Sequence, residues 1–221
     1  MENELAKYYR ELWRSLTTVT RRYSGVSLPL FISIPSGYEH SAFKLMVVGQ
    51  QTNSWYGFIG DSLGSDPVHR IQSYYRRFNL AEGYNSPFWH AIHNLQESLE
   101  PRVAPRSFVW SNLYICDQKK VLPDPFLSEQ LLNLRTLPHE IAILRPDAVV
   151  FFTGPRYDHT IKTLFPDVQF GRCGGRDGRL LSRVEHSELP RLSFRTYHPA
   201  YLRRSGQLGI LRAITGLLNE T

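Results

Sequence analysis

The sequence predicts an α/β protein: a three-layer α/β/α sandwich with a central, mainly parallel, four-stranded sheet. Short continuous apolar runs, such as residues 148–152 (AVVFF), suit strands that are buried on both faces of a parallel sheet. Segments with apolar residues at helical spacing alternate with these runs, as they do in βαβ units. At 221 residues and ordinary composition, the chain is expected to form one domain over residues 1–221.

The strands follow from apolar runs that end in Gly or polar residues. Residues 44–48 (KLMVV) stop at Gly49, and residues 148–152 follow the turn at Pro146. Two further strands complete the predicted sheet, which therefore has strands over residues 44–48, 107–113, 148–152 and 192–196.

The helices follow from apolar spacing and from start signals. Leu5, Leu12 and Leu16 recur at helical spacing within residues 4–18, which predicts an amphipathic helix packed on the body. Ser128 is the expected N-cap of a leucine-rich stretch through residue 144, in which Pro138 breaks or restarts the helix. Other helices are predicted over residues 67–78, 87–99, 156–164 and 207–218.

Two segments do not follow these patterns. Residues 54–86 are rich in aromatic, glycine and charged residues, and we expect a lid or part of a pocket wall there. Residues 171–179 (GRCGGRDGR) are rich in glycine, but they lack the strand-then-helix setting of a phosphate-binding loop. We expect a flexible basic loop there, within reach of a phosphate backbone.

The charge balance favours a polyanionic partner. The net charge is +6, the isoelectric point is about 9.4, and arginine, which suits bidentate phosphate contacts, outnumbers lysine. Nucleic acid is the expected partner, and a merely basic enzyme is the alternative. No apolar run approaches the roughly 20 residues that span a membrane, and the charged start of the chain has no signal-peptide core. We therefore expect no membrane partner, a cytoplasmic location and a monomer.

The cysteine count limits the cofactors. Cys116 and Cys173 are the two cysteines, too few for a four-thiolate iron–sulfur or zinc site. The sequence also lacks the HExxH, Walker and GxGxxG motifs. No cofactor and no metal are expected.

Three polar signals stand at the carboxyl ends of predicted strands. Residues 49–53 (GQQTN) end the first strand, Asn112 closes the second, and His198 and Pro199 follow the last. In a parallel sheet these ends share one edge, where ligands of α/β proteins bind. The sequence therefore predicts a crevice in which the three segments converge.

This pattern resembles the uracil-DNA glycosylase superfamily. Its members carry a Gly-led motif after the first strand, an Asn that ends a middle strand, and a His-Pro-Ser-type motif after the last. Here the corresponding segments are residues 49–53, Asn112 and residues 198–202 (HPAYL). The resemblance covers roughly residues 44–205. Each motif is common alone, and the specificity comes from their order and their place at strand ends.

The resemblance implies roles for the residues around the base. Gly49, Gln50 and the backbone beside them would line the base pocket, and Asn112 would hydrogen-bond the polar edge of the flipped base. His198 would lie beside a carbonyl oxygen of the leaving base. Trp55 is the preferred stacking ring because it lies just beyond the first motif, and the other aromatic candidates, which as single residues suit packing, are Tyr56, Phe58, Phe88 and Trp89.

The resemblance also implies contacts with DNA outside the base pocket. Leu202 would match the apolar wedge that fills the gap left in the duplex, and Arg203 and Arg204 would hold nearby phosphates. For Leu202 this interpretation requires an exposed side chain.

The chain departs from the family at the catalytic carboxylate. The family's water-activating Asp falls at Gln51, whose amide can orient a water but cannot accept its proton. Asn53 is a second amide within reach, and it aligns near the Tyr that excludes thymine's methyl group in the best-known members. Asp61 is the nearest downstream carboxylate and either replaces the missing base or is an exposed loop residue. Ala200 replaces the Ser of the His-Pro-Ser motif.

The resemblance implies a monofunctional DNA glycosylase, because no lysine lies in these motifs to form a Schiff base. The expected substrate is uracil or a bulkier 5-substituted pyrimidine. Asn53 aligns near the Tyr that excludes thymine's methyl group in the best-known members, and it need not block a 5-substituent. Some relatives remove hypermodified bases from phage DNA, so the role is either base-excision repair or antiviral defence. Two alternatives stay open: a noncatalytic nucleic-acid-binding protein on the same fold, and a nucleoside or nucleotide hydrolase.

Overall fold

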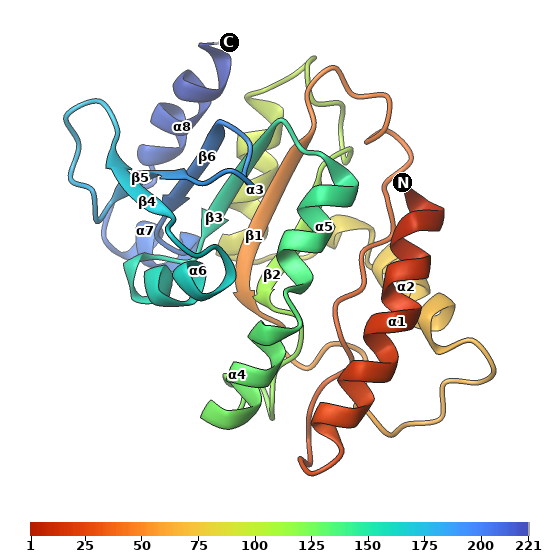
Figure 1. Cartoon of the computed structure of the whole chain (residues 1–221). Coiled ribbons are helices and arrows are strands. Elements are labelled where there is room, and N and C mark those ends of the chain that lie inside the picture. The colour runs from red at the N-terminus through yellow and green to blue at the C-terminus, as the bar shows by residue number, and fades with distance from the viewer. Residues whose placement is uncertain (221) are drawn as a thin grey trace.

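The computed structural model of the protein, which describes residues 1–220, has a central sheet between two layers of helices (Figure 1). The strand order is β2-β1-β3-β6-β5-β4. The predicted α/β fold with a mainly parallel central sheet is confirmed, and the sheet has six strands where four were predicted. Among the described residues, no helix is long and apolar enough to cross a membrane.

The parallel part of the sheet contains the four strands that the sequence predicts. They are β1 (Leu45–Gln51), β2 (Val109–Tyr114), β3 (Ala148–Phe152) and β6 (Leu192–Thr196), and β1 and β3 pair at the centre. β3 is buried at every position, as its continuous apolar run requires. The carboxyl ends of all four strands lie at one edge of the sheet.

The two additional strands form an antiparallel hairpin, β4 (Gln169–Arg172) and β5 (Leu181–Glu185), beside β6. The expectation of a flexible basic loop over residues 171–179 is therefore partly wrong, since its first residues belong to β4. The rest of the loop is held by the buried guanidinium of Arg195, which donates to the carbonyl oxygens of Gly178 and Arg179 at 3.1 and 2.7 Å. These strands, QFGR and LSRVE, are short and mostly polar, so no apolar run in the sequence reveals them.

The helices cover both faces of the sheet (Figure 1). One layer contains α1 (Glu2–Thr20), α4 (Pro125–Asn133), α5 (Thr136–Leu144) and α6 (Asp158–Leu164). The opposite layer contains α3 (Pro87–Glu97), α7 (Pro199–Arg204) and α8 (Ile210–Asn219). The described chain also contains two short 3₁₀ turns, η1 (Asn79–Ala81) and η2 (Pro155–Tyr157).

The edge strand β2 is covered by α2 (Pro67–Phe78), which lies beside α1. The Tyr75 hydroxyl donates to the carbonyl oxygen of Trp110 at 3.1 Å and accepts from its N–H at 2.8 Å. These bonds satisfy backbone groups of the sheet edge, which would otherwise be open to another strand.

The helix starts follow short capping sequences. Asp66 and Ser86 cap α2 and α3, each directly before a Pro at the first helical position. Ser128 is not the cap that the sequence suggests, because Asp124 caps α4 by accepting from the Phe126 N–H at 3.0 Å. The predicted interruption before residue 144 is real, and it comes at Arg135, whose φ is +49°.

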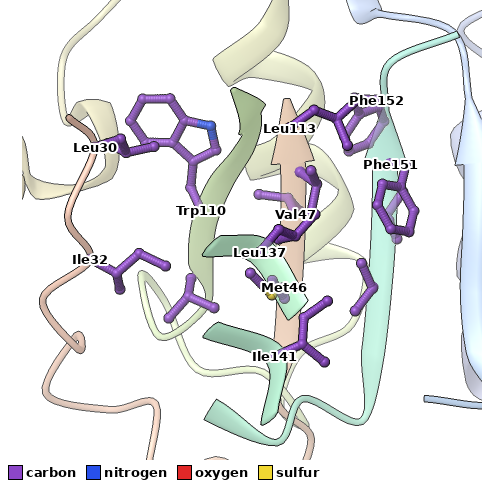
Figure 2. Close-up of a cluster of buried hydrophobic side chains, with 14 of the residues drawn as sticks. Leu30, Ile32, Met46, Val47, Trp110, Leu113, Leu137, Ile141, Phe151 and Phe152 are labelled. Carbon is purple, nitrogen blue, oxygen red and sulfur yellow. The ribbon is translucent and has the colours of Figure 1, made fainter. Parts of the chain in front are cut away.

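Large apolar side chains fill the layer between α5 and the sheet. Figure 2 shows Leu137 and Ile141 of α5 beside Met46 of β1, with Phe151 of β3 near them. All of these side chains are buried. This packing fixes β1 against its neighbours and so fixes the loops that leave their carboxyl ends.

Candidate functional site

A cleft with a volume of about 760 Å³ opens at the carboxyl ends of the parallel strands. It brings together the loop after β1, the end of β2, the start of α3 and the start of α7. Seven of the ten predicted site residues line it: Gly49, Gln50, Gln51, Asn53, Trp55, Asn112 and His198. The convergence of three segments far apart in the sequence is therefore present, and residues of the 54–86 segment form part of the cleft wall.

The contact between Gly49 and Asn112 explains why residue 49 is a glycine. The two residues are partners in the register of β1 and β2, and the Asn112 side chain lies over the Gly49 Cα. A Cβ at position 49 would collide with Asn112 Oδ1 and come within 3.3 Å of the Phe88 ring. Gly49 is thus required by close packing in the cleft floor, and any larger residue would displace Asn112.

A buried carboxylate under the cleft, Asp117, holds the loop after β1. It accepts from the Thr52 hydroxyl at 2.9 Å and the Ser54 N–H at 2.7 Å, and its other oxygen accepts from the Lys120 N–H at 2.7 Å. Asp117 is 1% exposed, so these charge-assisted bonds fix the loop in place. The sequence does not single out Asp117, because Thr52 and Ser54 lie 65 and 63 residues away in the chain.

The amides after β1 are positioned from neighbouring loops. Gln50 Nε2 donates to the carbonyl oxygen of Thr153 at 2.9 Å, and Gln51 Oε1 accepts from the Tyr157 hydroxyl at 3.3 Å. Asn53 lines the cleft with an exposed side chain.

None of the cleft-lining residues of the described chain carries a carboxylate. Asp61 lies outside the cleft lining and accepts from the Phe58 N–H at 2.8 Å in an exposed turn. Of the two interpretations of Asp61, the exposed loop residue fits this geometry.

His198 is held as a neutral hydrogen-bond donor. Its Nδ1 accepts from the Ala200 N–H at 3.2 Å, which leaves the ring proton on Nε2. Burial and, secondarily, the charge of Arg204 lower the pKa of His198 below its ordinary value near 6.5. At neutral pH the ring therefore presents an uncharged Nε2–H.

The face of the His198 ring is covered by Phe88. The two rings are stacked, with centroids 5.3 Å apart and an interplanar angle of 17°. Trp55, the preferred stacking candidate, is instead packed edge to face against Tyr56, Phe78 and Trp110. Phe88 is thus the ring placed to stack beside the imidazole, and sequence position alone could not separate it from the other aromatic residues.

Three donors in the cleft wall have no hydrogen-bond acceptor within residues 1–220: Asn112 Nδ2, Trp55 Nε1 and Trp110 Nε1. All three side chains are at least nine-tenths buried. An unpaired buried donor costs about 1–3 kcal/mol, and a ligand that supplied acceptors to this wall would remove that cost. The sequence could have suggested Trp110, which lies two residues before Asn112 on the same strand face.

The three predicted DNA contacts lie outside the cleft lining. Leu202 is 0% exposed and packs in the core, so the expectation of an exposed wedge is wrong. The sequence could not show this, because the short helix α7 turns Leu202 inward. Its neighbour Tyr201 is 42% exposed and stacks on Tyr197 with centroids 4.2 Å apart. Arg203 and Arg204 are exposed, and neither side chain forms an ion pair among the described residues.

A second groove, of about 750 Å³, runs between α3 and α8 beside the cleft. Arg203 and Arg212 line it together with polar residues of α3, and Pro87 belongs to the lining of both cavities. Arg203 of α7 and Arg212 of α8 therefore lie in a groove that adjoins the cleft at Pro87.

Among the described residues, Lys120 is the one lysine in the cleft lining. It lies outside the three sequence motifs, and the loop held by Asp117 brings it to the cleft. Within the described chain, no group of three or more His, Cys, Asp or Glu residues could hold a metal ion.

No protein-family model matches the sequence, and no curated protein matches it.

Proposed function

We propose that the protein is a monofunctional DNA glycosylase that flips a modified base into the cleft and hydrolyses its N-glycosidic bond. The base is uracil or a bulkier 5-substituted pyrimidine, and the product is an abasic site. The observation that carries the proposal is the convergence of residues 49–53, Asn112 and His198 in one cleft. Its order of motifs is similar to that of the uracil-DNA glycosylase superfamily.

Base recognition is assigned to Asn112. Its amide offers both a donor and an acceptor, so it can distinguish the polar edges of bases. The unpaired Nδ2 supports this role, because a base carbonyl would supply the missing acceptor. Phe88 is assigned to stacking against the base, from its position beside His198.

Departure of the base is assigned to His198. The N–C1′ bond breaks with its electron pair on the base, and the neutral Nε2–H donates a hydrogen bond to the carbonyl oxygen where that charge develops. One such preorganised donor contributes roughly a hundredfold or more to the rate.

The water step proceeds in this proposal without a carboxylate. Gln51 and Asn53 orient a water, which adds to C1′ of the sugar cation and loses its proton to solvent. Base departure therefore precedes the attack of water, and leaving-group stabilisation carries most of the catalysis.

DNA as the substrate is supported by the basic surface around the cleft. Arg203, Arg204 and Arg212 carry fixed charges beside the site, and they suit phosphate contacts. Because Leu202 is buried, Tyr201 is the large exposed side chain within this motif. The enzyme acts in repair or in defence against phage DNA with modified bases.

The experiment that tests the proposal incubates the protein with duplex and single-stranded DNAs that carry different modified bases, and scores alkali-labile abasic sites. We expect cleavage for at least one modified base and none for the same DNA with ordinary bases. A borohydride arm tests the monofunctional assignment: a trapped covalent complex that is lost in Lys120→Ala would show a Schiff base instead.

A noncatalytic nucleic-acid-binding protein is the second candidate, and the absence of a carboxylate from the cleft lining favours it. It predicts retained DNA binding with no abasic sites for any base. Efficient cleavage of free nucleosides with no cleavage of DNA would instead indicate a nucleoside hydrolase.

A further inference from the structure

A cluster of tyrosines lies between the mouth of the cleft and α2. Tyr56 and Tyr84 line the cleft and are 41% and 58% exposed. The Tyr56 ring also stacks on Tyr74 of α2, with centroids 4.6 Å apart and an interplanar angle of 2°. We call Tyr56, Tyr74 and Tyr84 the tyrosine platform, and it extends the aromatic surface out of the cleft onto α2.

The loop after β1 holds Tyr56 in place. The φ of Tyr56 is +51°, in the left-handed region that residues with a side chain rarely adopt. On one side of it the Ser54 N–H donates to Asp117 at 2.7 Å, and on the other the Gly57 carbonyl oxygen accepts from the Leu28 N–H at 2.9 Å. The loop therefore presents the tyrosine ring at the rim of the cleft before any ligand binds.

Two exposed arginines of α2 accompany the platform. The guanidinium carbon of Arg77 lies 5.2 and 6.0 Å from the centroids of the two stacked tyrosine rings, and that of Arg70 lies 5.8 Å from the Tyr74 centroid. Neither Arg70 nor Arg77 forms an ion pair within residues 1–220, whereas Asp66 and Glu82, near the two ends of α2, each pair with another arginine. This surface therefore combines exposed rings with positive charge that no carboxylate neutralises.

We propose that the tyrosine platform binds unpaired bases of a single nucleic-acid strand next to the base in the cleft. Aromatic rings stack on bases of any identity, and the guanidinium groups of Arg70 and Arg77 suit the phosphates between those bases. A duplex keeps its bases paired and stacked on one another, so it cannot use the rings in this way. The inference rests on the nucleic-acid partner of the proposed function and adds a second binding surface, outside the base pocket.

The test measures fluorescence anisotropy with two single strands of about 12 units. One is an oligodeoxyadenylate, and the other carries abasic tetrahydrofuran units, which keep the phosphates but have no bases. Adenine is used because the proposed cleft takes pyrimidines. We expect the wild-type protein to bind the adenine strand at least about tenfold more tightly, because each base stacked on an aromatic ring contributes roughly fivefold or more to the affinity.

Two variants locate the effect on the platform. Tyr56→Leu and Tyr74→Leu each remove a ring, and each should weaken binding of the adenine strand about fivefold or more while changing binding of the abasic strand less than about twofold. Phe126→Leu removes an exposed ring of α4 outside the cleft lining and should bind both strands like the wild type. In the wild type, the adenine strand should also protect Tyr56 and Tyr84 from nitration by tetranitromethane, and the abasic strand should not.

The outcomes separate this inference from the proposed function. Equal wild-type affinities for the two strands, or no protection by the adenine strand, would overturn the platform and leave the glycosylase to its own assay of abasic sites. Tyrosine variants that lose the abasic strand or a matching adenine–thymine duplex as strongly as the adenine strand would also overturn it. If no modified base is excised, the glycosylase proposal fails, while a base-dependent affinity that is lost in the tyrosine variants still supports the platform. The wild-type affinities and nitration pattern decide the inference even if a variant does not fold.

Discussion

At the scale of single residues, the cleft depends on side chains held in one protonation state or one position. His198 is neutral because it is buried near Arg204, and its Nδ1 is occupied by the Ala200 N–H. Asn112 keeps its place because Gly49 has no side chain to displace it. These constraints lead to two predictions.

The first prediction concerns His198. His198→Ala should lower single-turnover cleavage of the preferred DNA by roughly a hundredfold or more, because the leaving base loses its donor. The measurement is abasic-site formation under enzyme excess. His40→Ala changes an exposed histidine outside the cleft and should cleave like the wild type. A folded His198→Ala protein with undiminished cleavage would remove His198 from the mechanism.

The second prediction concerns Glu140, a fully buried carboxyl on α5. It accepts from the Tyr9 hydroxyl at 2.7 Å and the Ser111 hydroxyl at 2.6 Å, and no cation within residues 1–220 is paired with it. Burial raises the pKa of Glu140 from about 4.5 to about 7. The folded protein therefore binds the proton more tightly than the unfolded chain does. The stability from this group is fully present below pH 4.5 and is lost as the pH rises through 7.

Glu140→Gln should remove this pH dependence. Between pH 4.5 and 8 the wild type should lose on the order of 3 kcal/mol relative to the variant, measured by urea unfolding. The tyrosines that interact electrostatically with Glu140, including Tyr9, have raised pKa values and do not titrate in this range. Parallel stability curves for the two proteins would contradict the prediction.

At the scale of elements, the β4–β5 hairpin depends on one ion pair. Arg195 is 2% exposed and bonds Asp158 of α6 at 2.9 and 3.1 Å, in addition to the two loop carbonyls. It thus joins β6 to a helix and to the loop before β5. The predicted loop is ordered by a residue 16 positions later in the chain.

The third prediction follows from this pair. Arg195→Met should destabilise the protein by about 3 kcal/mol, near the lower end for a broken buried pair, because Asp158 keeps 25% of its side chain exposed. Urea unfolding measures the loss. The double variant Arg195→Met/Asp158→Leu, which leaves no unpaired charge, should be more stable than the single one. A double variant less stable than the single one would contradict this account.

The elements that sequence predicted are those with a local pattern. The parallel strands have apolar runs, and α2 has a capping Asp66 followed by Pro67. The hairpin and the buried state of Leu202 come from tertiary contacts, which no local pattern encodes. The cleft motifs were predictable because carboxyl strand ends converge in a parallel sheet. Asp117 and Lys120 were not, because only the folded loops bring them near.

At the scale of the whole molecule, the protein has a net charge of +6, and some of its exposed cations lie near the cleft. Arg203 and Arg204 follow the His198 motif, and Arg212 lies across the second groove. Arg191 lies at the amino end of β6, the opposite edge of the sheet, and offers a matched comparison.

The fourth prediction concerns these cations. Arg203→Ala and Arg204→Ala should each weaken DNA binding with little sequence dependence and reduce the slope of log affinity against log salt by about one unit. Fluorescence anisotropy over a salt series measures this slope. Arg191→Ala should leave the slope near the wild-type value. Equal slopes for all four proteins would place the DNA on another surface.

For the proposed glycosylase, the stacking of Phe88 on His198 adds a selection step before any chemistry. A flat base held between two rings needs roughly 7 Å between them, because each face-to-face contact takes about 3.5 Å. The observed 5.3 Å leaves no room for a third ring. A base that stacks on this face of Phe88 must therefore displace the imidazole, which breaks a favourable contact that the protein makes with itself. In the proposed function, a base that gains little from the cleft leaves this contact in place and returns to the duplex.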